Sequence, residues 1–385
     1  MSTLPIAFNY KYYTTEHETE TYDLYFDAPV VQHIAYHLDD VGHVVRQAEQ
    51  LQTSGYYVAL YLPYEAARYF NADMAVHDCP EGTVYAACYA FEQPVTPPDP
   101  TTLRQHDNGA RANFTYTETD AAMASAIHDI QSAIVEGETY QVNYTTRLTG
   151  ANSRPIRDVY YQRVAQGHGH YTALVDTPEL QIASLSPELF FQKGTFEGEA
   201  ACIVSKPMKG TMPRGATPEE DARHYDALRQ STKDRAENVM IVDLLRNDMT
   251  RVSEFGSIKV LSPFHIEQYD TVFQMTSMIK STLKPNTRLE QMMAALFPCG
   301  SITGAPKLRT MSYIKALEQS PRQAYCGTIG LLMPTGRMIF NVAIRTIQYT
   351  DTHAVYGVGA GITINSIAAN EIQEFKDKTR ILEGI

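Results

Sequence analysis

Three charged residues near the end of the chain have the spacing of a single helix face. Glu371, Glu374 and Lys378 follow one another at intervals of three and four, and at about 100° per residue they fall within an arc of roughly 60°. A further carboxylate, Glu237, precedes a run of residues apolar enough for a buried helix. A buried glutamate needs a cation, and carboxylate oxygens with open positions beside them suit Mg²⁺. For each glutamate alone, a solvated helix face is the alternative.

Alternating glycines mark a strand close to these carboxylates in the sequence. Gly357, Gly359 and Gly361 leave one face of such a strand without side chains. Either a flat ligand or another stretch of backbone is therefore expected to lie on that face. The preceding strand is expected to place Arg345 on the same face as Asn341. An arginine at this position suggests a clamp for a carboxylate, and a structural ion pair is the alternative.

A glycine-rich loop at residues 297–307 leads into a predicted helix. Gly300, Ser301 and Gly304 lie in this loop. Their backbone amides would meet an anion at the start of the helix. The turn pattern alone does not identify the anion.

Composition restricts the classes of function. The net charge of −12, from 32 basic and 44 acidic residues, argues against a nucleic-acid surface and against a basic membrane patch. The five cysteines are odd in number and form no C-x-x-C pair, which favours reduced thiols in a cytoplasmic protein. No run approaches the ~18 apolar residues of a membrane span, and the first residues lack the pattern of a secretory signal.

The elements that must hold these side chains indicate an α+β fold. Helices are expected at 119–136, at 233–246 and from about 366 to 382, and an alternating strand at 139–148. Three strands at 323–333, 337–349 and 354–364, joined by short turns, predict an antiparallel meander. Large antiparallel sheets packed as a sandwich, with helices on the outside, follow from this mixture. A boundary near residue 115 divides an N-terminal region, 1–115, from a catalytic domain, 116–385.

These pieces, in this order, resemble one family, the chorismate-binding enzymes. The family includes enzymes that add ammonia or water to chorismate. The resemblance runs from about residue 119 to the C-terminus, and it is weaker before residue 115, where it rests on 55–67. Its motifs occupy residues 140–143, 185–188, 207–211, 233–248, 297–307, 340–346 and 359–361, together with the helix that carries Glu371, Glu374 and Lys378.

The resemblance implies a role for each matched position. Glu237 and Glu374 would bind Mg²⁺ directly with Glu371 beside them, and the metal would hold the ring carboxylate of chorismate. The substrate would be bound by further residues of the same motifs: Arg345, Tyr325 and the backbone of Gly359, Ala360 and Gly361 at the enolpyruvyl group, Gly210 and Thr211 at the ring, Lys378 near the carboxylate, and Gln141.

Two positions choose between the branches of the family. Members that use water carry a lysine base where this chain has Gln141, so an ammonia-using branch is expected. A lysine at position 209 resembles the branch of the family that aminates C4. The resemblance implies that Lys209 would attack C2 and that Glu188 would act as general acid and base. The product would be 4-amino-4-deoxychorismate, a step toward 4-aminobenzoate and folate. The alternatives are anthranilate synthase component I and a non-catalytic chorismate-binding subunit.

The resemblance also implies partners. Ammonia would come from a separate glutamine amidotransferase subunit, because no nucleophilic cysteine motif of such an enzyme is evident, and a separate lyase would act on the product. One departure from the family concerns a segment that contains histidine in relatives. Here Phe273 and Gln274 occupy that region, and their role is left open.

Overall fold

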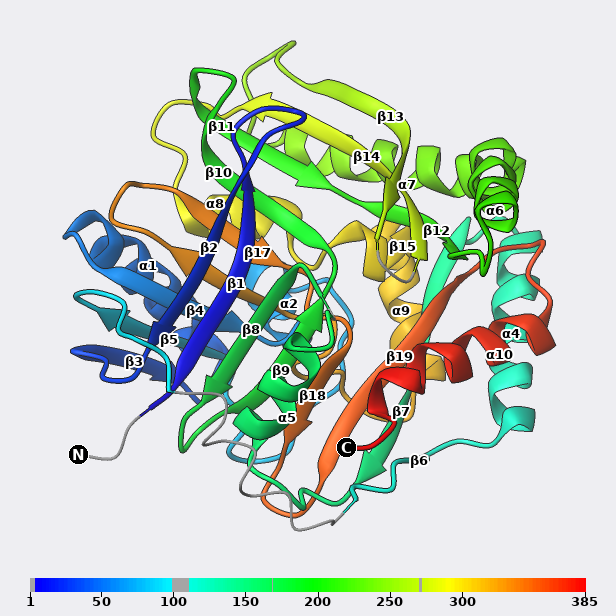
Figure 1. Ribbon diagram of the computed structural model, residues 1–385, viewed down its shortest axis with the longest axis horizontal. Coiled ribbons are helices and arrows are strands. Elements are labelled where there is room, and N and C mark those ends of the chain that lie inside the picture. The colour runs from blue at the N-terminus through cyan, green and yellow to red at the C-terminus, as the bar shows by residue number, and fades with distance from the viewer. Residues whose placement is uncertain (1–3, 99–110, 168, 270–271) are drawn as a thin grey trace.

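The computed structural model describes residues 4–98, 111–167, 169–269 and 272–385. Two large antiparallel sheets lie face to face, and helices cover their outer faces (Figure 1). The α+β sandwich predicted from the sequence is confirmed. No helix within these ranges has the length and apolar content needed to cross a membrane.

The first sheet carries the glycine strand. Its nine strands run in the order β15-β7-β19-β18-β9-β8-β1-β2, with β6 beside β7. In that order they span Gly304–Ala305, Gln141–Gly150, Ala354–Ile362, Thr346–Tyr349, Gln181–Ser186, Tyr171–Asp176, Ile6–Tyr13 and Thr19–Phe26, and β6 spans Thr115–Tyr116. The glycine strand β19 lies between β7 and β18, and Gly361 is opposite Asn143 of β7 in their antiparallel register.

The second sheet carries Lys209. Its ten strands run in the order β12-β14-β11-β10-β17-β16-β4-β5-β3, with β13 beside β14. In that order they span Met208–Pro213, Val272–Thr282, Glu199–Lys206, Leu189–Phe196, Met338–Asn341, Thr328–Leu332, Tyr57–Leu62, Ala86–Phe91 and Val31–Ala35, and β13 spans Lys259–Gln268.

Large apolar side chains fill the space between the two sheets. Phe8 and Tyr10 of β1 pack in one cluster with Tyr61 of β4, Met278 of β14 and Ile329 of β16. Alternation along each strand sends these residues inward and their neighbours to the outer face. The sheets therefore hold each other in register, which fixes the positions of the strand ends that carry charged residues.

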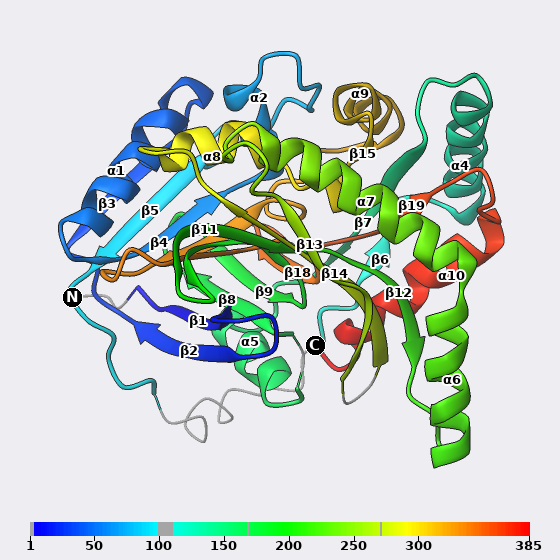
Figure 2. The same cartoon turned by 90° about the horizontal axis from the view of Figure 1, so that it is seen from above.

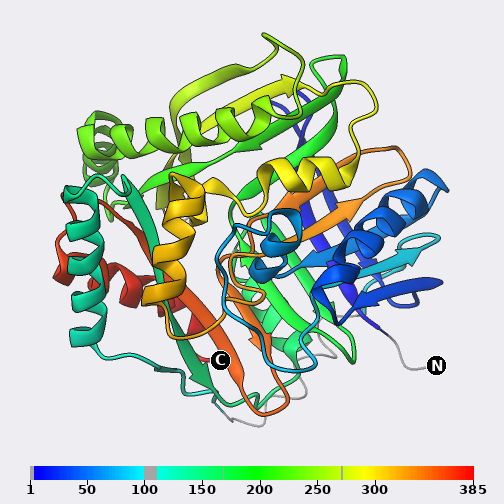
Figure 3. The ribbon, with the colours of Figure 1, turned by 180° about the vertical axis from the view of Figure 1, so that it is seen from behind.

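Helices cover both outer faces. α1 (Val41–Thr53), α8 (Leu289–Leu296) and α7 (Thr232–Thr250) run along the second sheet, as Figure 2 shows. α4 (Asp120–Val135), α5 (Ile156–Val164) and α10 (Ala368–Lys378) contribute to the core on the first sheet. α9 (Lys307–Leu317) packs beside β7, and α6 (Pro218–Gln230) beside β12 (Figure 3). A short α2 spans Ala67–Phe70. The helices predicted at 119–136 and 233–246 are confirmed as α4 and as part of α7.

The N-terminal region contributes strands to both sheets. β1 pairs with β8 in the first sheet, and β4 pairs with β16 in the second. These pairings join residues before 115 to residues well beyond it. The boundary near residue 115 stays a prediction.

The predicted meander at the C-terminal end is wrong in two respects. The strand expected at 323–333 begins only at Thr328, as β16, because Gln323 and Cys326 have left-handed φ values of 52° and 65°. The strand expected at 337–349 is two strands, because β17 ends at Asn341 in the second sheet and β18 begins at Thr346 in the first. Between them Arg345 has a φ of 51°, a left-handed value that breaks an extended run. Asn341 and Arg345 therefore do not share a strand face. Periodicity alone cannot reveal such a crossing, since the side chains continue to alternate in the sequence.

Candidate active site

Lys209 lies on β12 beside the glycine strand of the opposite sheet. A Cβ added at Gly361 would lie 3.1 Å from Nζ of Lys209 and 2.0 Å from Nε2 of Gln141. The missing side chain at this position therefore makes room for both polar groups. The glycine at position 361 is therefore explained by the close approach of the Lys209 and Gln141 side chains.

Glu188, in the turn between β9 and β10, is the buried acid of the site. Its side chain is 3% exposed, and burial raises its pKa to about 7, against the opposing effects of a Ser301 hydrogen bond and of the Lys209 and Lys378 ammonium groups. Oε1 of Glu188 has no hydrogen-bond partner within the described ranges, and neither has the amide of Gln141. Buried polar atoms without partners cost about 1–3 kcal/mol each, so a ligand is expected to satisfy them.

Three glutamates predicted to bind metal come from two helices. Glu237 lies on α7, and Glu371 and Glu374 lie on α10. The ammonium of Lys233 is 3.9 Å from a carboxylate oxygen of Glu237 and 3.9 Å from one of Glu371. Burial raises the pKa of Glu237, and the charge of Glu371 adds to that rise. Two carboxylates that repel each other thus face one cation.

The third glutamate is engaged elsewhere. Oε1 of Glu374 is 2.7 Å from Nζ of Lys378, and although burial acts to raise the pKa of Glu374, this ammonium holds it below its usual value. In the part of the chain that the structure describes, no three His, Cys, Asp or Glu side chains converge as a ready metal site. The oxygens of Glu237 and Glu371 suit a cation because they already flank one. Mg²⁺ stays a prediction.

Lys378 joins the terminal helix to the glycine strand. Its Nζ donates a hydrogen bond to the carbonyl oxygen of Gly359 at 2.7 Å. A Cβ at Gly359 would meet the carbonyl oxygen of Tyr144 at 2.3 Å, so close backbone packing explains this glycine. Ala360 points the other way and belongs to the core beneath α10.

Tyr325 lies at the far end of the same glycine face. Its ring fills the space where Gly357 lacks a side chain, since a Cβ there would be 2.2 Å from the ring. Gly357 and Gly361 are four residues apart in the strand, or about 13 Å. Tyr325 and Lys209 therefore lie at opposite ends of the bare strand face. The predicted contact of Tyr325 with substrate stays a prediction.

Arg345 has the properties of an anion-binding arginine. It is half-buried, and burial lowers its pKa, while nearby Tyr356 and Tyr269 oppose that shift. No carboxylate of the described chain forms an ion pair with its guanidinium. A structural ion pair, the alternative reading of Arg345, therefore lacks an acidic partner among these residues.

The remaining predicted residues lie on β12 and β14. Gly210 has a φ of 83°, and a Cβ there would lie 2.9 Å from Asp234, so two separate constraints require glycine. Thr211 is exposed and lies opposite Gln274. Phe273 packs against Tyr225 of α6. Because neighbouring residues of a strand face opposite sides, Gln274 faces the space between the sheets.

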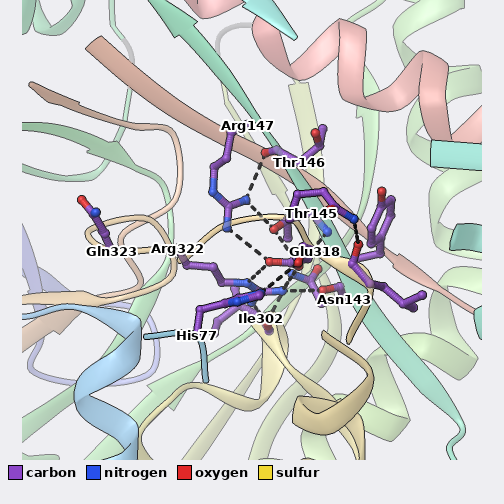
Figure 4. A network of polar contacts seen from close by, with 12 residues as sticks. His77, Asn143, Thr145, Thr146, Arg147, Ile302, Glu318, Arg322 and Gln323 are labelled. Carbon is purple, nitrogen blue, oxygen red and sulfur yellow. Dashed lines mark hydrogen bonds and ion pairs between the residues drawn. The ribbon is translucent and has the colours of Figure 1, made fainter. Parts of the chain in front are cut away.

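The side-chain role of Ser301 and a buried ionic network were not predicted from the sequence. The backbone amides of the loop at 297–307 stay a predicted anion site, and the hydroxyl of Ser301 in addition forms a hydrogen bond with Glu188. In Figure 4, Glu318 accepts hydrogen bonds from Arg147 at 3.2 Å and from Arg322 at 2.6 Å. Thr145 of β7 donates to the same carboxylate at 2.8 Å. The only signal in the sequence was the alternating polar face of β7. Glu318, the partner of Thr145 and Arg147 of that strand, lies more than 170 residues away from them in the sequence.

Comparison with known proteins covers almost the whole chain. Residues 9–384 match the family described as chorismate binding enzyme. Aminodeoxychorismate synthase component 1 of Klebsiella aerogenes is 38% identical over 276 residues, which are 71% of this chain and 59% of that protein. An anthranilate synthase component 1 of Haloarcula marismortui is 35% identical over 273 residues, which are 71% of this chain and 53% of that protein. The matches thus span less than two thirds of the length of these relatives.

Solved structures share the fold. Anthranilate synthase component I from Streptococcus pneumoniae has a TM-score of 0.75 and 22% sequence identity, with 100% of this chain and 92% of that chain covered. The arrangement of two sheets with outer helices is therefore the fold of chorismate-utilising enzymes. The resemblance carried by the motifs is confirmed, and the chain belongs to the chorismate-binding enzyme family.

Proposed function

We propose that this chain aminates chorismate at C4 and forms 4-amino-4-deoxychorismate. The observation that carries the proposal is the position of Lys209, whose Nζ would lie 3.1 Å from a Cβ at Gly361 and whose charge opposes the rise in the pKa of Glu188 and of Glu237. One primary amine thus lies within electrostatic range of both the candidate acid and a candidate metal ligand. The names of relatives such as the Klebsiella aerogenes protein support the same reaction.

The first chemical step uses Lys209 as nucleophile. Its uncharged amine attacks C2 of the ring, the ring double bonds shift, and the C4–O bond breaks. Glu188 gives its proton to the departing oxygen, which leaves as water. A carboxyl whose pKa is raised to about 7 is protonated in a large fraction of molecules near neutral pH, as a general acid requires.

The second step releases the lysine. Ammonia forms a bond to C4, the double bonds shift back, and the bond between C2 and Nζ breaks. Lys209 leaves as a neutral amine, and the surplus proton on the new C4 nitrogen returns to Glu188. The net change is the replacement of a hydroxyl by an amino group, with water released and the enolpyruvyl group retained.

Binding of the substrate falls to the residues around this pair. Arg345, which lacks an acidic partner among the described residues, would hold a carboxylate of chorismate, and the amide of Gln141 would hydrogen-bond the ring substituents. Glu237, Glu371 and Glu374 would hold Mg²⁺, which when bound supplies positive charge for the ring carboxylate. Lys378 would add to that charge.

The ammonia is proposed to come from a separate glutamine amidotransferase subunit, and a lyase would convert the product to 4-aminobenzoate. The component 1 name of the relatives fits a two-component enzyme. A cytoplasmic location is proposed with this pathway.

Product analysis tests the function directly. The purified chain is incubated with chorismate, Mg²⁺ and an ammonium salt, and the products are identified by mass spectrometry. The expected product has gained nitrogen, has kept the enolpyruvyl group and aromatises only after a lyase is added. Fluorescent anthranilate with release of pyruvate would instead establish the activity named for the Haloarcula marismortui relative. Binding of chorismate without any turnover would indicate a non-catalytic subunit.

A further inference from the structure

The loop that carries Tyr325 is held in a strained conformation. Gln323 has a φ of 52° and Cys326 a φ of 65°, and neither residue is glycine. Left-handed backbone at such residues is unfavourable and persists only where the surroundings impose it. Residues 322–327 therefore need firm anchors on their neighbours.

Glu65, far away in the N-terminal region, supplies one anchor. It lies in a short 3-10 helix, Tyr64–Ala66, directly after β4. Its two carboxylate oxygens accept hydrogen bonds from the backbone N–H groups of Arg322 at 2.7 Å and Gln323 at 2.9 Å. In return, the N–H of Tyr64 donates to the carbonyl oxygen of Gln323 at 2.9 Å. With only 1% of its surface exposed, Glu65 makes these bonds without competition from water.

The side chain of Arg322 extends the anchor toward the active site. Its guanidinium stacks over the ring of Tyr64 at 4.6 Å and donates to the carboxylate of Glu318, at the centre of Figure 4. Glu318 also binds Arg147, whose guanidinium lies 5.4 Å from the centre of the Tyr325 ring. A continuous set of contacts thus runs from Glu65 to Tyr325, and that ring packs on Gly357.

We propose that Glu65 is a positioning residue of the substrate site, which fixes the loop of residues 322–327 so that Tyr325 packs against the glycine strand. The inference rests on the proposed function and on the predicted contact between Tyr325 and chorismate. It assigns the N-terminal region an indirect part in substrate binding, through Glu65.

The substitution Glu65→Gln tests this role. A carboxamide has one accepting oxygen, and its NH₂ group would face the second backbone N–H. The dissociation constant of chorismate, measured by titration calorimetry with Mg²⁺ and without ammonia, is expected to rise about tenfold, the factor that corresponds to one lost hydrogen bond of about 1.4 kcal/mol. Glu290→Gln is the matched control, because the partners of Glu290 among the described residues, Arg46 of α1 and Tyr69, lie outside this loop. It should leave the dissociation constant unchanged.

A double-mutant cycle separates positioning from general stability. If Glu65 acts through the ring of Tyr325, then Glu65→Gln should change the dissociation constant less than twofold in a Tyr325→Ala background, which lacks the ring. The proposal is wrong if the fold-changes in the dissociation constant from the two single substitutions simply multiply in the double variant. Gln323→Gly, which removes the strain at one position, should restore much of the binding lost in Glu65→Gln. This pair also carries the test if Glu65→Gln alone fails to fold.

The outcomes distinguish this inference from the proposed function. Wild-type protein that does not bind chorismate would contradict the proposed function. Wild-type protein and Glu65→Gln that bind chorismate equally well would contradict the positioning role alone.

Discussion

Replacing Glu188 by glutamine should change how the stability of the protein depends on pH. Burial raises the pKa of Glu188 from 4.5 to about 7. At 1.36 kcal/mol per pKa unit, that rise corresponds to roughly 3 kcal/mol. The folded protein binds this proton more tightly than the unfolded chain does. The contribution of Glu188 to the free energy of unfolding is therefore fully present below pH 4.5 and is lost as the pH rises through about 7.

The glutamine variant has a similar shape and no titrating group at this position. The free energy of unfolding of the wild type, minus that of Glu188→Gln, should fall by roughly 3 kcal/mol between pH 4.5 and pH 8. Urea unfolding of both proteins at a series of pH values measures this difference. Glu318→Gln is a control of opposite sign: despite burial, Arg322 and Arg147 hold the pKa of Glu318 low, so its contribution is lost as the pH falls.

Parallel stability curves for the wild type and Glu188→Gln would refute this reasoning. They would mean that Glu188 is ionised in the folded protein at neutral pH, as an exposed glutamate would be. The proton delivered to the C4 oxygen would then need another source, and the buried, unpartnered Oε1 of Glu188 would need another explanation.

Three further substitutions test other parts of the site. Lys209→Ala should abolish amination while chorismate still binds, measured by mass spectrometry and calorimetry; an unchanged rate and product would remove its nucleophilic role. Lys233→Met should tighten Mg²⁺ binding, because it removes an ammonium that lies 3.9 Å from each of two carboxylates. The expected gain is only about fivefold, since the Lys233 side chain is 56% exposed and its charge is screened by solvent. Lys376→Met is the control. Gly361→Ala should lower kcat with little change in Tm, since its Cβ would displace Gln141; normal turnover would show that these side chains rearrange freely.

The sequence was sufficient to predict features that depend on local spacing. The terminal helix with Glu371 and Glu374, the helix around Glu237 and the bare glycine strand follow from periods of 3.6 and 2, and the structure has all three. Lys209 and Glu188 were identified through the family motifs rather than through spacing. The electrostatic contact between Lys209 and Glu188 depends on the tertiary fold, and no local pattern reports it.

Features that depend on which sheet a strand joins could not be predicted. The crossing between Asn341 and Thr346 keeps the alternation of side chains, so no local pattern reveals it. Likewise, Glu65 stands alone in a short turn, and its partners Arg322 and Gln323 are more than 250 residues away in the sequence. Burial of such a charge is decided by distant backbone amides, which sequence periodicity does not report.

The pairing of β4 with β16 also bears on how the chain is made. Residues 57–62 can complete their ladder only when residues 328–332 have left the ribosome, and β1 waits in the same way for residues 171–175. Such distant pairings slow folding and leave unpaired strand edges exposed meanwhile. β4 is therefore synthesised early and completed late, and a chaperone that covered its free edge in that interval would prevent mispairing.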